Sequence, residues 1–234
     1  MKYDIFIEGE TVDLCIPVDD EDVVRQWSSW FNKSEITRYL SQGMYPNTVN
    51  NQKEYFDEIR NSSKKILCLL KPKKYDGYIG VVSLSEINHI QRQCTMALVV
   101  GEKYKGPDSI FIGLEAKALI TKHAIEVVGV ERINSLQVVN LKKWQNMQIL
   151  FGYQVEGLLR NKFRKGNKTY DMLISSCLLE DYEKLLTARN GEFWPGKSKV
   201  FDLMRKLPED TLIDRLMEWI ANEQKKYWKL VFEK

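Results

Sequence analysis

Residues 94–116, CTMALVVGEKYKGPDSIFIGLEA, decide the predicted fold, because they join a strand to a helix through a glycine-flanked loop. Residues 96–100 form a short apolar run that suits a buried strand, and Gly101 ends it. Asp108 or Ser109 is placed to cap the helix, whose apolar residues recur at helical spacing along one face. A loop that enters a helix start offers free backbone N–H groups and the positive end of the helix dipole, which together favour an anion.

This order of elements resembles the GNAT superfamily of CoA-dependent N-acyltransferases. The central motif of that family is a strand, a loop of the form Q/R-x-x-G-x-G/A and a helix. Aligning Glu115-Ala116 with the usual Glu-Ala places the loop at residues 108–113. Gly113 is kept, whereas Asp108 stands where Gln or Arg is usual and Phe111 where the first glycine is usual. The amides of this loop hold the pyrophosphate of acyl-CoA in the family, so Phe111 must point away from the phosphates.

The resemblance covers roughly residues 10–184. Within the superfamily, the chain resembles the ribosomal-protein-acetyltransferase-like branch. Residues 11–40 match its first strand and acid-led helix, and FGYQVEGLLRNKF matches its G-[FY]-x-x-E-G-x-x-R turn. The resemblance implies an α+β fold, with a mixed, mostly antiparallel sheet whose central strands splay apart between flanking helices. We expect an acyltransferase domain at residues 1–184 and a mainly helical extension at residues 185–234. The last helix should bury one face, in this chain or against a neighbouring copy: Leu212, Leu216, Trp219 and Ile220.

The bulk composition excludes several classes of protein. The 234 residues are 44% hydrophobic with a net charge of +3 and no polybasic block, which disfavours a nucleic-acid partner. No apolar run approaches the ~18 residues of a membrane span, and the acidic N-terminus does not suit a signal peptide, so we expect a cytoplasmic protein. Four scattered cysteines and two histidines give no metal-ligand cluster, and the cysteines are expected to be buried free thiols.

The resemblance implies acetyl-CoA or another short acyl-CoA as the donor. In the family the pantetheine arm lies between the fourth and fifth strands, here residues 96–100 and 131–140, and an asparagine that ends the fifth strand contacts it. A backbone amide aimed at the thioester oxygen would stabilise the transition state. The expected cofactor-binding residues are Leu98, Val99, Val100, Ser109, Ile110, Phe111, Ile112, Gly113, Asn140 and Trp144.

The acceptor side is expected around the first helix and the turn-rich residues 41–51, because loops on a rigid scaffold carry specificity. An arginine there could pair with a phosphate, although a solvated arginine is the commoner outcome. The tryptophans of the first helix could line this cleft, although core packing explains them equally simply. The expected acceptor-side residues are Trp30, Arg38, Tyr39, Tyr45 and Thr95, with Gln42 as a further candidate.

Both usual acid–base groups of the branch are replaced. Thr95 stands where many members carry a glutamate, and Gln148 stands where many carry a tyrosine that protonates the thiolate. Glu86 is then the nearest carboxylate, as a general base or an amine-binding group. A lysine amine, with a pKa of about 10.4, needs help to lose its proton, whereas an amino sugar titrates nearer neutrality and needs mainly positioning.

These replacements favour direct transfer of an acyl group to the amine of a nucleotide-linked amino-deoxy sugar, of the kind used for surface polysaccharides. The expected partner is a small-molecule amine. The sequence leaves open whether the chain forms a homo-oligomer. A protein N-terminal acetyltransferase is the alternative enzyme, which an acidic acceptor cleft would favour. A degenerate GNAT fold that serves as a binding or interaction module is the alternative of another class.

Overall fold

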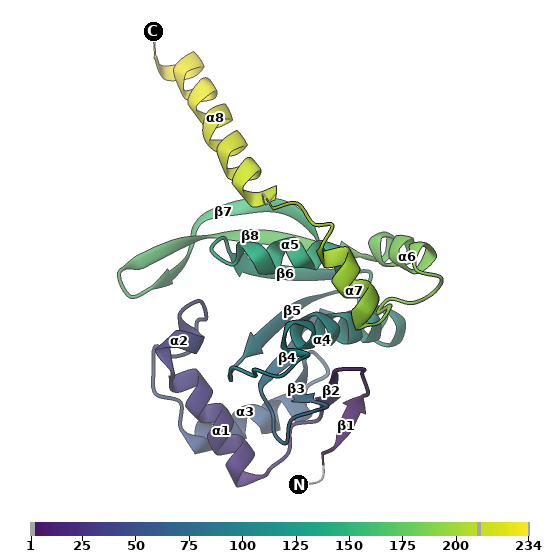
Figure 1. Cartoon of the computed structure of the whole chain (residues 1–234). Coiled ribbons are helices and arrows are strands. Elements are labelled where there is room, and N and C mark those ends of the chain that lie inside the picture. Colours follow the sequence, from purple (N-terminus) through teal and green to yellow (C-terminus); the bar gives the residue numbers. More distant parts are fainter. Residues whose placement is uncertain (1–2, 210–211, 234) are drawn as a thin grey trace.

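The computed structural model describes residues 3–209 and 212–233 and is built on one eight-stranded sheet in the order β1-β2-β3-β4-β5-β6-β8-β7 (Figure 1). Neighbouring strands are antiparallel except β5 and β6, which run parallel and are joined through a helix. The expected α+β fold is confirmed. The strands are β1 Ile5–Ile7, β2 Val12–Cys15, β3 Ile66–Pro72, β4 Gly80–Asn88, β5 Gln93–Val100, β6 Arg132–Val138, β7 Gln154–Lys165 and β8 Lys168–Leu178.

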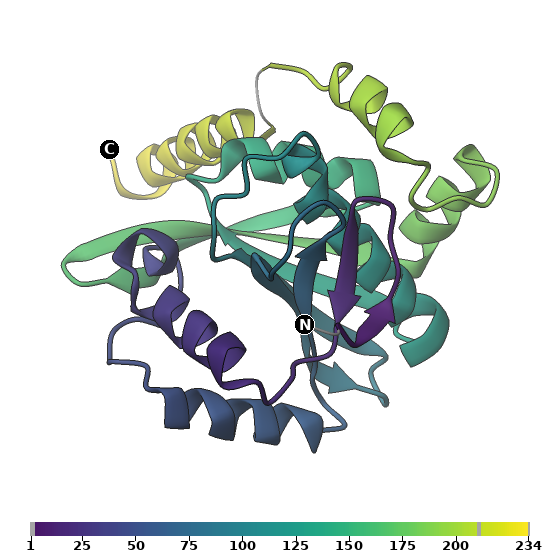
Figure 2. The same ribbon diagram turned by 60° about the horizontal axis from the view of Figure 1, so that its bottom comes forward.

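Helices cover both faces of the sheet, as Figures 1 and 2 show. On one face, α1 and α3 pack together and bury Trp27 and Phe56 against strand residues such as Leu69. On the other face, α4 buries Ile112 in a second cluster that includes Leu84. The helices are α1 Glu21–Asn32, α2 Ser34–Thr37, α3 Val49–Arg60, α4 Ser109–His123, α5 Lys142–Gln148, α6 Leu179–Ala188, α7 Lys197–Met204 and α8 Leu212–Phe232.

Helix α1 forms where the acidic entry predicted it. The Asp20 side chain accepts hydrogen bonds from the backbone N–H groups of Asp22, at 2.9 Å, and Val23, at 3.2 Å, which satisfies two of the free donors of the first turn. The apolar face of the helix buries Trp27 and Trp30 beneath the acceptor side of the sheet. This arrangement fixes the short helix α2, which follows α1 directly.

Helix α4 is buried on more than the single face that its sequence predicted. The buried residues include Glu115, Lys117 and Thr121, because α4 is enclosed between the sheet and the later helices. The Glu115 carboxylate accepts hydrogen bonds from the backbone N–H groups of Glu10, at 2.5 Å, and Thr11, at 2.7 Å, so it ties α4 to the start of β2. Burial raises the pKa of Glu115 above its usual value.

The C-terminal part begins inside the core and ends outside it. Phe193 and Val200 belong to the same hydrophobic cluster as α4, so the boundary at residue 184 stays a prediction. We expect one face of α8 to be buried, in this chain or against a neighbouring copy. Within this chain alone, that prediction is wrong. Leu212 is 42% exposed and Trp219 is 63% exposed, because α8 projects away from the sheet and buries only Ile213.

Two further observations concern membranes and metals. None of the helices within residues 3–209 and 212–233 is long and apolar enough to cross a membrane. Over the same residues, no three His, Cys, Asp or Glu side chains come together as ligands of a metal ion. All four cysteines are buried free thiols, and burial raises the pKa of Cys68 and Cys94 to about 12.

Candidate functional site

The candidate site is the opening between β5 and β6. These strands pair only from Gln93 to Thr95 on β5 and from Arg132 to Asn134 on β6. Beyond Thr95 the two strands separate, and each keeps only its outer neighbour, β4 or β8. A cavity of about 750 Å³ occupies the opening, which is the size of a small-molecule site. The expected splay of the central strands is therefore present.

The apolar run of β5 predicted a buried strand, and the strand is buried only in part. Met96 is buried, but Ala97 and Val100 are exposed, because β6 no longer covers them. Residues 96–100 line the cavity, and their backbone edge on the β6 side has no strand partner. Such an edge offers N–H and C=O groups to an extended ligand, as in β-strand addition.

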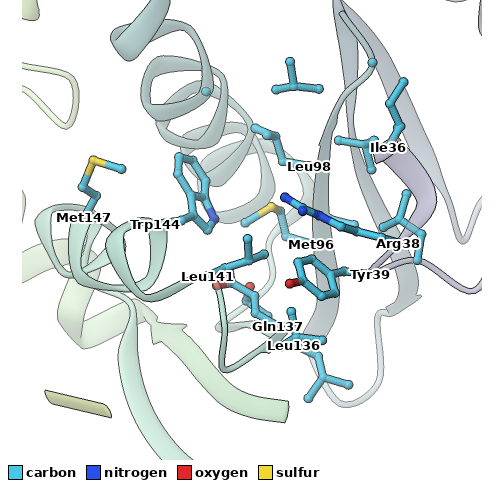
Figure 3. A pocket seen from close by; sticks show the side chains of 18 of the residues that line it. Ile36, Arg38, Tyr39, Met96, Leu98, Leu136, Gln137, Leu141, Trp144 and Met147 are labelled. Atoms are coloured by element: carbon cyan, nitrogen blue, oxygen red, sulfur yellow. The ribbon is translucent and has the colours of Figure 1, made fainter. Parts of the chain in front are cut away.

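The cavity reaches both faces of the sheet. On the α4 side it is lined by Ser109, Ile110 and Gly113 of α4 and by Trp144 of α5. On the opposite side it is lined by Glu35, Arg38 and Tyr39 around α2, and by Met172 of β8. Figure 3 shows Arg38 and Tyr39 entering the pocket from one side and Trp144 from the other. Two molecules can thus approach one point from opposite faces.

Gly113 leaves a narrow channel open on the α4 side of the cavity. A Cβ atom at this position would lie 3.4 Å from the Trp144 ring and 3.8 Å from Leu98. Any longer side chain would fill the space between α4 and α5. The glycine therefore keeps a channel beside the aromatic ring of Trp144, which is suited to a thin apolar arm.

The start of α4 offers fewer free amides than the loop motif predicts. The Ser109 N–H donates to Gly106 O at 3.1 Å and the Phe111 N–H to Asp108 O at 2.9 Å. The Asp108 side chain does not cap the helix and instead pairs with Lys197, at 3.0 Å, and Lys74, at 3.1 Å. These ammonium groups hold the pKa of Asp108 below its usual value. Asp108 and the two lysines are not among the residues that line the cavity.

Phe111 and Ile112 do not line the cavity. Phe111 is 9% exposed and Ile112 is 1% exposed, and both belong to the core beneath α4. Phe111 therefore points away from the cavity, as the replacement of the motif glycine requires. Asn140 lies in the exposed turn after β6 and is also outside the lining residues, whereas Leu141, one residue later, contributes to the lining.

At the closed end of the splay, a side-chain hydrogen bond joins two expected site residues. Thr95 is the last residue of β5 that pairs with β6, and its Oγ1 lies 2.8 Å from Oε2 of Glu86. Glu86 reaches it from β4 through an irregularity between Ser85 and Asn88, where the backbone φ of Glu86 is +54°. The bulge thus brings the Glu86 carboxylate next to Thr95, the position at which the sequence resemblance expects a glutamate.

The side of the cavity that is lined by Arg38 and Tyr39 is bounded by the long β7–β8 hairpin. Lys165, near the tip of the hairpin, donates to Leu40 O at 3.0 Å and also to Gln42 O. Tyr170 of β8 packs edge-on against Tyr39, with ring centroids 5.5 Å apart. The Arg38 guanidinium lies 4.9 Å from the centre of the Tyr39 ring, and no carboxylate among the described residues pairs with it. A cation inside a pocket without a paired anion can receive a negatively charged ligand.

Four of the expected acceptor-side residues do not line the cavity, namely Trp30, Gln42, Tyr45 and Thr95. Trp30 is 2% exposed and supports the cavity wall from behind, where its Nε1 donates to Glu102 at 3.1 Å and its ring contacts Gly101. Tyr45 is 83% exposed and does not line the cavity. Core packing, the alternative interpretation of Trp30, is therefore its structural role.

Sequence reasoning missed Gln137. It lies on β6 and lines the cavity, and its Oε1 is buried without a hydrogen-bond partner among the described residues. A buried carbonyl oxygen without a donor is costly, so a ligand N–H is the natural partner. The only signal in the sequence is its place two residues after Ser135, on a strand that faces the opening.

Gln148 does not reach the cavity. It is buried, and its Oε1 accepts a hydrogen bond from the ammonium or amine of Lys117, which lies in the core of α4. The Lys117 Nζ also lies 3.3 Å from the centre of the Tyr153 ring. Gln148 therefore takes part in an internal contact between α4 and α5.

No protein-family model and no curated protein matches the chain. Among solved structures, a spermidine N-acetyltransferase from Vibrio cholerae in complex with CoA and spermine is 15% identical, with a TM-score of 0.64 over 75% of this chain and 99% of that chain. A GCN5-related N-acetyltransferase from Brucella melitensis is 17% identical, with a TM-score of 0.63 over 85% and 88%. RimJ from Mycobacterium smegmatis, in complex with CoA-disulfide, is 15% identical, with a TM-score of 0.62 over 76% and 88%. The chain has the fold of these acetyltransferases.

Proposed function

We propose that the chain is an acyl-CoA-dependent N-acyltransferase that transfers the acyl group directly to an amine. The observation that carries this proposal is the cavity that passes through the sheet where β5 and β6 separate. One face of the cavity offers the unpaired edge of residues 96–100 and the Gly113 channel, which fit the arm of acyl-CoA. Solved structures with this fold hold CoA, which supports the same ligand here.

The residues at the closed end of the splay position the amine. Bound acyl-CoA supplies an activated thioester. As the amine nitrogen forms its bond to the acyl carbon, the carbon–sulfur bond breaks, CoA leaves as its thiolate, and the amine gives up a proton. Glu86 is the carboxylate that orients the amine and receives that proton, directly or through water, and Thr95 holds it by their hydrogen bond.

The proposed acceptor is an amino-deoxy sugar linked to a nucleoside diphosphate. The supporting observation is Arg38, which extends into the pocket toward Leu98 and Trp144 without a paired carboxylate among the described residues (Figure 3). An arginine matches phosphate oxygens in a bidentate manner, so it suits a diphosphate carried beside the amine. The Gln137 carbonyl oxygen can accept a hydrogen bond from the same ligand.

A cationic polyamine is a second candidate acceptor, because the carboxylate of Glu35 also lines the pocket. A neighbour with this fold is described as a spermidine N-acetyltransferase. The two acceptors require opposite effects of Arg38, since its charge attracts a diphosphate and repels a polyamine. Arg38 therefore separates the two proposals experimentally.

The test is an acyl-CoA assay over nucleotide-linked amino sugars and polyamines, with wild type, Arg38→Gln and Arg38→Lys. For a nucleotide-linked acceptor, Arg38→Gln should raise KM by about tenfold or more, with partial recovery in Arg38→Lys. An unchanged or lower KM for a polyamine acceptor would favour the second candidate. Calorimetry with acetyl-CoA completes the test: absence of both acyl-CoA binding and turnover would refute the enzyme proposal and favour a binding module.

A further inference from the structure

Residues 35–40 form the wall of the cavity that carries Arg38, because all of them except Thr37 line it. The wall belongs to the loop that follows α1. The base of this loop is closed by Asn32 Nδ2, which donates to Asn47 O at 2.8 Å, and by Asn47 N–H, which donates to Asn32 Oδ1 at 2.7 Å. These bonds fix the two ends of the loop and leave the position of its middle, residues 38–42, to contacts with other elements.

Lys165 contacts the middle of the loop from the β7–β8 hairpin. It is the last residue of β7 and is followed by a two-residue turn, whose first residue, Gly166, has a φ of +57° that glycine adopts without strain. The Lys165 ammonium donates to Leu40 O at 3.0 Å and also to Gln42 O. Figures 1 and 2 both place the end of the hairpin beside α2. The hairpin thus holds a wall of the cavity to which Lys165 itself does not belong.

An aromatic contact on the same face of the hairpin supports the ammonium. Phe163 pairs with Tyr170 across the hairpin, and Lys165 pairs with Lys168 two residues further along. Since residues two apart on a strand point to the same face, Lys165 and Tyr170 face the loop together. The Tyr170 ring packs against Tyr39 with centroids 5.5 Å apart. Residues 38–42 are therefore held at two points, one aromatic and one polar.

The polar contact depends on the ammonium alone. No carboxylate within residues 3–209 and 212–233 pairs with Lys165, and over the same residues Leu40 O and Gln42 O have no other donor. Burial lowers the pKa of Lys165, because the contact takes the ammonium partly out of water. Leu40 is partly buried and Gln42 is exposed, so water can replace the lost donor in a variant. Removing the ammonium should therefore free the loop without unfolding the protein.

We propose that Lys165 is a positioning residue for the acceptor, because its ammonium holds residues 38–42 against the hairpin and so orders Arg38 and Tyr39 in the cavity wall. This inference rests on the proposed function, in which Arg38 receives the acceptor. Lys165 acts through the loop, since it does not line the cavity. A loop that is ordered before binding lowers the entropic cost of binding, so the contact should strengthen acceptor binding.

Amide hydrogen exchange of the full chain without ligands tests the contact itself. Lys165→Met keeps the aliphatic stem and removes the donors. In this variant the Leu40 amide, which donates to Thr37 O at 2.9 Å, should exchange about tenfold faster than in wild type. Lys168→Met is the matched control, because Lys168 lies opposite Lys165 on the hairpin, is exposed and makes no contact with the loop that the structure describes. It removes the same charge and should leave the exchange unchanged.

Steady-state kinetics with acetyl-CoA and an amine that wild type acylates test the role in binding. Lys165→Met should raise the acceptor KM by about fivefold, while kcat and the KM of acetyl-CoA stay within about twofold of wild type. Lys165→Arg, which keeps a cationic donor, should recover part of the loss. The effects of Lys165→Met and Arg38→Gln on the acceptor KM should not add in the double variant, because both act on the same stretch of loop.

Unchanged exchange of the Leu40 amide in Lys165→Met would overturn the proposal. An acceptor KM that rises equally in Lys165→Met and Lys168→Met would also overturn it, because the charge of the hairpin would then attract the acceptor without the contact. A wild type that acylates no amine would refute the proposed function and, with it, the acceptor role of Lys165. The exchange experiment would still show whether Lys165 holds the loop, so the two failures are distinguishable.

Discussion

Replacing Lys117 by methionine should change how the stability of the protein depends on pH. Lys117 is fully buried in α4, with Gln148 Oε1 and the Tyr153 ring as its described contacts and no carboxylate beside it. Burial lowers the pKa of its amine well below the usual value, because water no longer solvates the charged form. Methionine has a similar length and an apolar end, so Lys117→Met removes the proton-binding group and largely keeps the packing.

The sign of the effect follows from proton linkage. Between the lowered native pKa and the unfolded value of about 10.4, the unfolded chain binds a proton that the native chain does not. In this window the free energy of unfolding of wild type rises with pH by about 1.4 kcal/mol per unit relative to Lys117→Met. The stability gained by the variant is therefore largest at low pH and disappears toward pH ~10.

Loss of the donor to Gln148 works against the variant at every pH. An unsatisfied buried acceptor costs about 1–3 kcal/mol, so it lowers the free energy of unfolding of the variant by the same amount at every pH. The double variant Lys117→Met/Gln148→Leu should recover part of this cost, which separates the hydrogen bond from the burial of charge.

Urea unfolding between about pH 6 and pH 9 measures these free energies. Lys122→Met is the matched control, since Lys122 lies on the same helix with its side chain 52% exposed. It should follow the pH dependence of wild type. If the free energies of unfolding of wild type and Lys117→Met change with pH in parallel, the native amine stays protonated despite its burial. That result would refute the reasoning.

Three other substitutions or truncations test the structure. Glu115→Ala should lower the free energy of unfolding by about 3 kcal/mol in urea titrations, because Glu10 N–H, Thr11 N–H and the Thr11 hydroxyl lose their common acceptor; full stability would contradict the role of Glu115. Gly113→Leu should weaken acetyl-CoA binding by about tenfold or more in calorimetry while the circular dichroism stays unchanged, because the side chain fills the channel beside Trp144; wild-type affinity would place the arm elsewhere. A chain that ends at Lys184 should be insoluble and one that ends at Leu207 soluble, because Phe193 and Val200 complete the core; equal solubility would show that the core does not need them.

The sequence predicts the centre of the fold because its signals are local. An apolar strand, a glycine stop and a helix start occupy one continuous stretch, and β5 and α4 form there as expected, although no side chain caps α4. The capping residues predict the start of α1 for the same reason, since Asp20 lies next to the amides that it bonds. The splay of β5 from β6 follows from the resemblance to a known family, because no residue pattern in either strand states where pairing stops.

The features that the sequence does not predict depend on contacts between distant residues. Lys165 reaches Leu40 and Gln42, which are more than a hundred positions earlier in the chain, so the closed acceptor side is invisible to a local pattern. Lys117 occupies a helical position where a lysine is expected to be solvated, yet the surrounding helices bury it. The exposure of α8 is the opposite case: amphipathic spacing predicts an apolar face and does not say what covers it.

The Glu86–Thr95 pair places a carboxylate beside position 95, where the sequence resemblance expects a glutamate. A glutamate at position 95 would need no special backbone, whereas Glu86 reaches the same point only through a left-handed residue in a bulged strand. A non-glycine residue in that conformation costs on the order of 1–3 kcal/mol, which the surrounding β4–β5 ladder must offset. The Glu86 side chain is exposed, and its Oε2 accepts a hydrogen bond from the Thr95 hydroxyl. The conformation, together with the Thr95 hydrogen bond at the closed end of the splay, supports a carboxylate held there for the acceptor amine.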